Sequence, residues 1–273
     1  MTVRLSTGLV QAMASQQSLR TALDNTVVDI YSGSQPATAD EAITGTYLCT
    51  VSKSAGAFTA EVKGVGMFTI AGAASGSINT LTLAGIDLLN GVPVTCAYAG
   101  SNYNADAVTV AAAINASPTN NLVVASATGS SGIVTLTAVS GMGAKLNGLT
   151  IAGTVTTVTV TATNGLFGSG TSTNTVGVVA ANGVTFSAAV AGVLPKNTLE
   201  TWSGTAAAAG TAGCFRISGE ATAQATRQGA SATAIRLDGA LATSGGDINL
   251  GSLTVSSGAP FILSTFSLTV PKV

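Results

Sequence analysis

Apolar residues near the start of the chain recur every three or four positions, which is the spacing of one face of a helix. Ser6 or Thr7 supplies an N-cap, and Asp24 with Asn25 supplies a stop. The pattern predicts one helix over residues 5–24, with an apolar face formed by Leu9, Val10, Met13, Leu19 and Leu23.

After residue 25 the pattern changes to alternation, which predicts short strands separated by turns rich in Gly, Ser, Asn and Pro. A second helix is expected at residues 104–116, where a capping Asn precedes an apolar face that includes Val108 and Ala111. Residues 168–177, rich in Ser, Thr and Gly, are expected to form a linker. Strands are expected near residues 26–31, 46–51, 66–71, 78–89, 93–99, 121–128, 132–139, 149–163, 184–190, 198–203, 213–219, 234–239, 248–255 and 261–270.

Charged and aromatic residues are distributed unevenly along this strand-rich chain. All five arginines and the single tryptophan lie outside residues 61–183, which indicates that this middle segment is a separate unit. Insertion of a domain at an exposed turn costs little closure entropy. We therefore expect a discontinuous β-sandwich base domain at 1–60 and 184–273, and an inserted β-rich domain with one helix at 61–183. The expected fold class is mainly β: a jelly-roll-like β-sandwich with an N-terminal helix, interrupted by a small α+β or immunoglobulin-like domain.

Composition argues against most catalytic chemistry. The 273 residues include no histidine, only 8% are charged, and 46% are apolar. Histidine is the usual proton shuttle at neutral pH and the commonest metal ligand, so we expect neither an enzyme nor a bound metal or cofactor. A formal net charge of −1 gives no electrostatic attraction to nucleic acid. No apolar run reaches the roughly 20 residues of a membrane helix, and the N-terminus has no secretory pattern, so no membrane association is expected.

Individual residues with possible chemistry have simpler interpretations. Cys49, Cys96 and Cys214 are far apart in the sequence and are expected to be buried and reduced. The Asp40–Glu41 pair is expected in a solvated turn, and Asp238–Gly239 is interpreted as a turn at a strand end. Trp202 is interpreted mainly as a core anchor, with an exposed contact as the alternative.

Several segments at the two ends of the chain resemble a family of tailed-bacteriophage virion proteins. The N-terminal segments are RLSTGL at 4–9, SLRTAL at 18–23 and DIYSGSQPATAD at 29–40. The C-terminal segments are TWSG at 201–204, AGCFR at 212–216, RLDG at 236–239 and ILSTFSLTVP at 262–271. Together they span the base domain, a little over half of the chain. The middle segment is similar only to small β-rich modules that are common in phage head and tail proteins.

The resemblance implies a structural virion protein made in the host bacterial cytoplasm and carried on the virion. The preferred interpretation is a capsid decoration (cement) protein that binds the major capsid protein or other virion subunits as a homodimer or homotrimer. The alternatives are a tail component, such as a tube, tip or fibre protein, and a host-surface glycan-binding module. The residues expected to contribute to these interactions are Arg4, Leu9, Met13, Arg20, Trp202, Arg216 and Arg236. For Arg216 and Arg236, an ordinary salt bridge within the domain is the favoured alternative.

Overall fold

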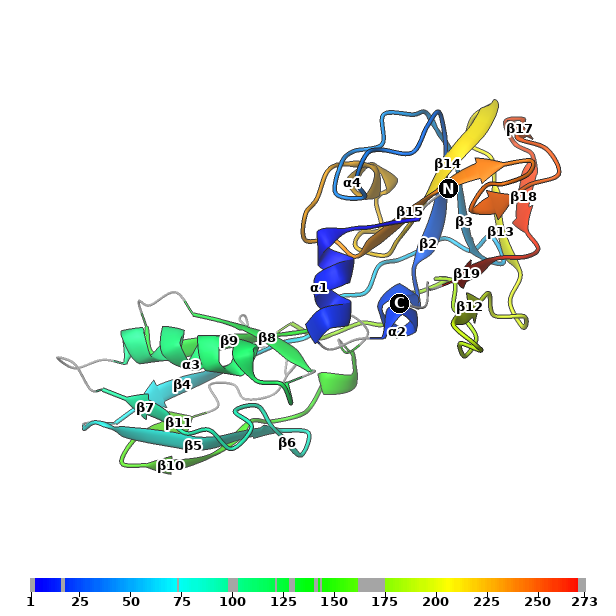
Figure 1. The fold of residues 1–273 in the computed structure, drawn as a ribbon. Helices are drawn as coiled ribbons and strands as arrows, with labels where there is room; N and C mark the ends of the chain where they lie inside the picture. The colour runs from blue at the N-terminus through cyan, green and yellow to red at the C-terminus, as the bar shows by residue number, and fades with distance from the viewer. Residues whose placement is uncertain are drawn as a thin grey trace. The chain divides into compact units, whose positions relative to one another are not determined.

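The chain divides into two compact units, which are connected twice (Figure 1). The computed structural model describes residues 3–15, 18–72, 74–97, 103–120, 122–127, 131–139, 142, 144–161 and 175–269. The outer unit contains Met1–Glu61 and Ala180–Val273, and the insert contains Val62–Val179. The sequence-based bounds of the insert, 61–183, differ from these by one residue at the start and four at the end.

A nine-stranded sheet forms the framework of the outer unit. Its main path runs in the order β1-β15-β14-β2-β3-β13-β18, with β16 beside β15 and β17 beside β14. All pairs are antiparallel except β15 with β16. The strands are β1 (Arg4–Leu5), β2 (Val27–Ser32), β3 (Tyr47–Lys53), β13 (Trp202–Thr205), β14 (Gly210–Ser218), β15 (Arg236–Ala242), β16 (Ile248–Asn249), β17 (Thr254–Val255) and β18 (Pro260–Leu263).

One face of this sheet is apolar and fully covered. Alternate strand residues such as Val28, Ile30 and Ile217 point into a single buried cluster. That cluster is completed by α1 (Thr7–Ser15), α2 (Leu19–Leu23) and the two-stranded sheet of β12 (Val193–Pro195) and β19 (Ser267–Thr269). The opposite face carries buried charges instead, and loops together with α4 (Gln224–Gln228) supply the groups that bond to them.

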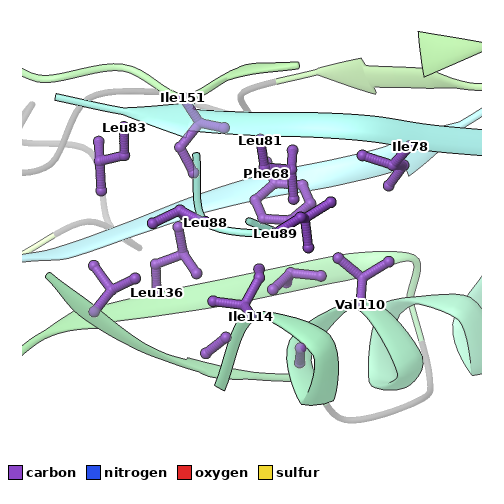
Figure 2. Packing of buried hydrophobic residues seen from close by; sticks show 14 of the residues in the cluster. Phe68, Ile78, Leu81, Leu83, Leu88, Leu89, Val110, Ile114, Leu136 and Ile151 are labelled. Carbon is purple, nitrogen blue, oxygen red and sulfur yellow. The ribbon is translucent and has the colours of Figure 1, made fainter. Parts of the chain in front are cut away.

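The insert has its own core between two four-stranded sheets and one helix. The strands β4 (Val65–Ala71), β8 (Val123–Ser126), β9 (Ile133–Ala138) and β11 (Thr159–Thr161) pair in the order β11-β4-β9-β8. In the second sheet β5 (Gly76–Leu83) pairs with β10 (Ala152–Thr156), β6 (Ile86–Asp87) and β7 (Val94–Cys96). Figure 2 shows apolar side chains from these strands and from α3 (Asn104–Ala116) pointing toward one another. A short 3₁₀ helix, η1, covers Ala144–Leu146.

The two connections between the units run antiparallel to each other. In the outer unit the Thr59 N–H donates to the Ala181 carbonyl, and the Ala181 N–H donates to the Thr59 carbonyl. In the insert Val62 and Val178 make the same reciprocal pair of hydrogen bonds. The chain therefore leaves the outer unit and returns to it at residues that are hydrogen-bonded to each other.

The prediction of a mainly β protein is confirmed, and the structure contains several antiparallel sheets. The sheet order does not establish the jelly-roll topology. The helix at 104–116 is also confirmed, but its expected buried face is only partly correct. Ala111 is buried as expected, together with Ala107, Val110 and Ile114, whereas Val108 is 46% exposed.

Five expected elements differ from the structure, most of them because of local backbone chemistry; one of the five, the strand expected at 248–255, is divided into β16 and β17. The helix expected at 5–24 is divided into α1 and α2, since Ser18 is extended and its side chain caps a new helix by accepting from the Thr21 N–H. The strand expected at 78–89 turns at Ala84 and Gly85, both with positive φ, which makes β5 and β6 a hairpin.

The strand expected at 149–163 is divided at Thr157, where φ is 67°, so that β10 joins one sheet of the insert and β11 joins the other. The segment 184–190 forms only isolated bridges, and α4 was not predicted. The expected linker at 168–177 lies largely outside the described residues.

Asp238–Gly239 is not a turn, because both residues lie inside β15. A methyl group on Gly239 would approach the Phe215 ring to 2.3 Å. Glycine is therefore required here by a neighbouring aromatic ring, and the dipeptide only resembles a turn signal.

Candidate functional site

The most elaborate arrangement of polar side chains in the outer unit is centred on Arg216 and Asp238. Both side chains are fully buried, and they lie opposite each other on β14 and β15. Arg216 Nε and Nη2 donate to the two Asp238 carboxylate oxygens, each at 2.7 Å. Burial raises the pKa of Asp238, and the hydrogen bonds from Arg216 oppose that rise. Each charge therefore needs the other in order to remain buried.

The remaining donors of Arg216 hold two loops against the sheet. Nη2 donates to the carbonyls of Ala39 and Glu41, at 3.2 and 2.8 Å. Nη1 donates to the carbonyls of Arg227, Gln228 and Gly229, at 3.1 to 3.4 Å. A single guanidinium thus connects the loop after β2 with the segment around α4.

Two further buried arginines extend this network. Arg227 Nε donates to Asp29 at 2.7 Å and Nη2 donates to the other Asp29 oxygen at 3.0 Å. Arg227 Nη1 also donates to the carbonyls of Ala221 and Thr222, which precede α4. Arg236 pairs with Glu220 in the same segment. We call the three pairs Arg216–Asp238, Arg227–Asp29 and Arg236–Glu220 the arginine network.

The structure places Arg216 and Arg236 in ion pairs within the outer unit, which is the use that the sequence analysis favours over a contact with another protein. Arg216 is 0% exposed and Arg236 is 1% exposed, so neither guanidinium can reach a partner without unfolding its loop. Trp202 is equally unavailable, since it is 0% exposed. Its ring packs at 5.2 Å from Phe186 and 5.8 Å from Phe266, and its indole N–H donates to Glu200. The interpretation of Trp202 as a core anchor is confirmed.

The N-terminal segment, expected as a docking element, is partly built into the fold. Leu9 is fully buried in the apolar cluster and Met13 packs against that cluster from a half-buried position. Arg4 is half-buried, and its Nη1 lies 3.5 Å from the Gln35 carbonyl oxygen. Of the expected contact residues only Arg20 keeps an exposed guanidinium, with its side chain 47% accessible beside Asp24.

The Asp40–Glu41 pair has a structural role that the sequence did not reveal. Both Asp40 carboxylate oxygens accept from Thr7, one from its N–H at 2.9 Å and one from its hydroxyl at 2.6 Å. Asp40 therefore caps the first turn of α1 from a distant loop. Glu41 accepts from the Ala37 N–H within the same loop. Neither carboxylate is arranged as a general acid or base with a second group.

The thiols are inert in the folded chain. Burial, with nearby carboxylates, raises the pKa of Cys49 to about 12 and the pKa of Cys96 and Cys214 each to about 11. Such thiols are protonated at neutral pH and are poor nucleophiles. Within the described part of the chain, no group of three or more potential metal ligands comes together.

The described surface of the outer unit includes a shallow hollow and several exposed apolar residues. The hollow, of about 300 Å³, is lined by the start of α2, by the segment before β12 and by β12 itself, including Leu19, Arg20 and Leu194. Elsewhere Val190 is 70% exposed, Leu199 93% and Ile262 58%. The buried arginines and Trp202 are unavailable for contact with another protein, whereas these exposed apolar residues are accessible.

The arginine network could have been found in part from the sequence. Asp29 lies between Val28 and Ile30, and Arg216 between Phe215 and Ile217, so each charge alternates with apolar residues within a strand. Such alternation predicts that the charges share the second face of the sheet. Nothing in the sequence pattern indicates that loops cover this face, and Arg227 and Glu220 were therefore missed.

Comparisons with known proteins returned no relatives. No family model, curated protein or solved structure matches this chain. Among the described residues, no helix is long and apolar enough to cross a membrane.

Proposed function

We propose that this protein is a structural component of a tailed-bacteriophage virion, and within that class a decoration protein of the capsid surface. One observation carries the proposal. The segments that resemble phage virion proteins come from both ends of the chain, and four of them lie in or directly beside the adjacent strands β1, β15, β14 and β2.

The contacts between these segments support their belonging to one structural unit. The Ser6 hydroxyl donates to the Ala234 carbonyl at 2.7 Å and accepts from the Arg236 N–H at 3.0 Å. Asp40 caps α1 at Thr7, and Arg216 bonds to Asp238. The resemblance therefore falls on the groups that hold the outer unit together, which is what a conserved scaffold would require.

The distribution of polar groups is better suited to passive binding than to catalysis. The charged side chains in the outer unit that are nine-tenths or more buried are used in internal hydrogen bonds and ion pairs. A decoration protein binds many times over a shell through modest contacts that the symmetry of the shell multiplies. Exposed apolar residues and an uncharged sheet edge could supply such contacts at a low desolvation cost.

Copy number in purified virions is the direct test. Densitometry of virion proteins against the major capsid protein should give at least one copy per several capsid subunits, and cryo-electron microscopy should place the density on the outer face of the head. A few copies per virion, or stacked rings in the tail, would reject the decoration role and favour a tail component. Absence from purified virions would reject the virion assignment itself.

A further inference from the structure

The two edges of the nine-stranded sheet differ in how their backbone hydrogen-bonding groups are covered. On the β15 side the edge is covered by β1, by the Gln35 side chain, which donates to the Asp238 carbonyl, and by Asp247, which exchanges hydrogen bonds with Ala240. At the other end β18 pairs with β13, and among the described residues it pairs with no strand on its far side.

The β18 edge has no charged side chain to prevent edge-to-edge association, and its only protective features are its length of four residues and Pro260. Natural edge strands are commonly protected by charged side chains, especially lysine. No charged residue occurs between Asp247 and the end of the described chain at Thr269. Proline at position 260 begins the strand and removes one donor, but it leaves the next positions unprotected.

The register of β18 shows which backbone groups face outward. The Ala206 N–H donates to the Ala259 carbonyl, so these two opposed residues form a hydrogen-bonded pair of the antiparallel ladder. Hydrogen-bonded and non-hydrogen-bonded pairs alternate along an antiparallel ladder. Phe261 and Leu263 therefore bond to β13, whereas the N–H and C=O of Ile262 point away from it.

The Ile262 side chain points to the exposed face of the same edge. Leu263 is 1% exposed in the apolar cluster, and Phe261 packs against that cluster. Ile262 alternates with them and is 58% exposed. Within the described part of the chain neither backbone group of Ile262 has a partner, so this one residue presents a donor, an acceptor and an apolar side chain.

We propose that β18 pairs with β18 of a second copy of this chain, antiparallel about a two-fold axis at Ile262. The two Ile262 residues exchange reciprocal N–H to C=O hydrogen bonds. The Ser264 N–H of each copy then lies opposite the Pro260 carbonyl of the other, whereas the Ser264 carbonyl faces the proline nitrogen, which has no hydrogen to donate, and is left to water. The two Ile262 side chains pack against each other across the axis, where directly opposed Cβ atoms lie about 5 Å apart.

A second copy fits this edge better than a different partner does. The edge carries no charge with which to select an oppositely charged protein. A two-fold pair is self-complementary by construction, and a net charge of −1 gives little repulsion between copies. Four strand residues bury well under the roughly 1,200 Å² of a standard interface, so the isolated dimer should be weak, with a dissociation constant of about 10 μM to 1 mM.

Sedimentation of the purified full chain over that concentration range tests the pairing, independently of any role in a virion. The wild type should change reversibly from monomer to dimer. Ile262→Lys places two positive charges on the axis and should weaken the dimer at least tenfold. Val10→Lys is the matched control, since Val10 is 47% exposed on α1 and should leave the dissociation constant unchanged.

Amide hydrogen exchange provides a second readout that a merely destabilised variant cannot mimic. The Ile262 amide should exchange rapidly in dilute solution and slow down as the dimer fills, while the Phe261 and Leu263 amides stay protected throughout. A chain that remains monomeric to millimolar concentration would overturn the proposal. So would a dimer that Ile262→Lys does not weaken, or one in which the Ile262 amide stays unprotected.

Discussion

Removing one member of the Arg216–Asp238 pair should destabilise the outer unit strongly. Asp238→Ala leaves a guanidinium that is 0% exposed without its carboxylate. Breaking a fully buried ion pair on one side costs about 3–5 kcal/mol. The Arg20–Asp24 pair is the control, because its side chains are 47% and 24% exposed. Arg20→Ala should therefore cost no more than about 1 kcal/mol.

The double variant Arg216→Leu with Asp238→Leu distinguishes this network from an ordinary buried pair. Replacing both charges with apolar residues is often neutral or stabilising. Here Arg216 also donates to five loop carbonyls, from Ala39 and Glu41 and from residues 227–229. A buried acceptor that loses its donor costs about 1–3 kcal/mol. Since some of these carbonyls can bond to water, the double variant should remain destabilised by at least about 2 kcal/mol.

Urea unfolding followed by tryptophan fluorescence measures these losses directly. The single tryptophan, Trp202, lies in the core of the outer unit, so its emission reports on that unit. If Asp238→Ala leaves too little folded protein, Asp238→Asn keeps the side-chain volume and should give a smaller loss in the same direction. A loss for Asp238→Ala no greater than that for Arg20→Ala would refute the reasoning. A double leucine variant as stable as the wild type would refute the role of the loop carbonyls.

Three further outcomes are expected. Burial raises the pKa of Glu200, but hydrogen bonds from Thr185, Trp202 and Lys53 outweigh it and lower that pKa from its usual value. The ionised Glu200 therefore stabilises the fold above its unfolded-state pKa, and this contribution is lost as the pH falls through its folded-state pKa. Glu200→Gln should thus flatten the acid side of a curve of unfolding free energy against pH. Gly204→Ala should cost about 1–3 kcal/mol in the same fluorescence assay, because its Cβ would lie 2.0 Å from a backbone carbonyl oxygen of β3; an unchanged midpoint would contradict the close approach. Replacing residues 62–179 by a short Gly/Ser linker should leave an outer unit that unfolds cooperatively by circular dichroism, and a broad, non-cooperative transition would show that the unit depends on the insert.

Strand alternation predicts a mainly β protein, and the uneven composition predicts a base domain with an insert. Both predictions depend only on the order of residue types along the chain. Boundaries failed where a single side chain or backbone angle decided them, as at Ser18, Thr157 and Gly239. The ion pair expected for Arg216 within the domain is present, but neither its partner, Asp238, nor its complete burial was predicted. Arginine is exposed in most proteins, and only long-range pairing with Asp238 explains its burial.

The paired connections at Thr59 and Ala181 make it easy for recombination to exchange the insert in the gene that encodes this chain. Any coding segment whose product begins and ends at neighbouring points could be exchanged at this position by recombination that preserves the reading frame. The remaining protein would keep both ends of its own sheet, since those ends are already hydrogen-bonded to each other. Related chains can thus differ by a whole domain at this point while retaining the same framework, so that their overall lengths are a poor guide to their kinship.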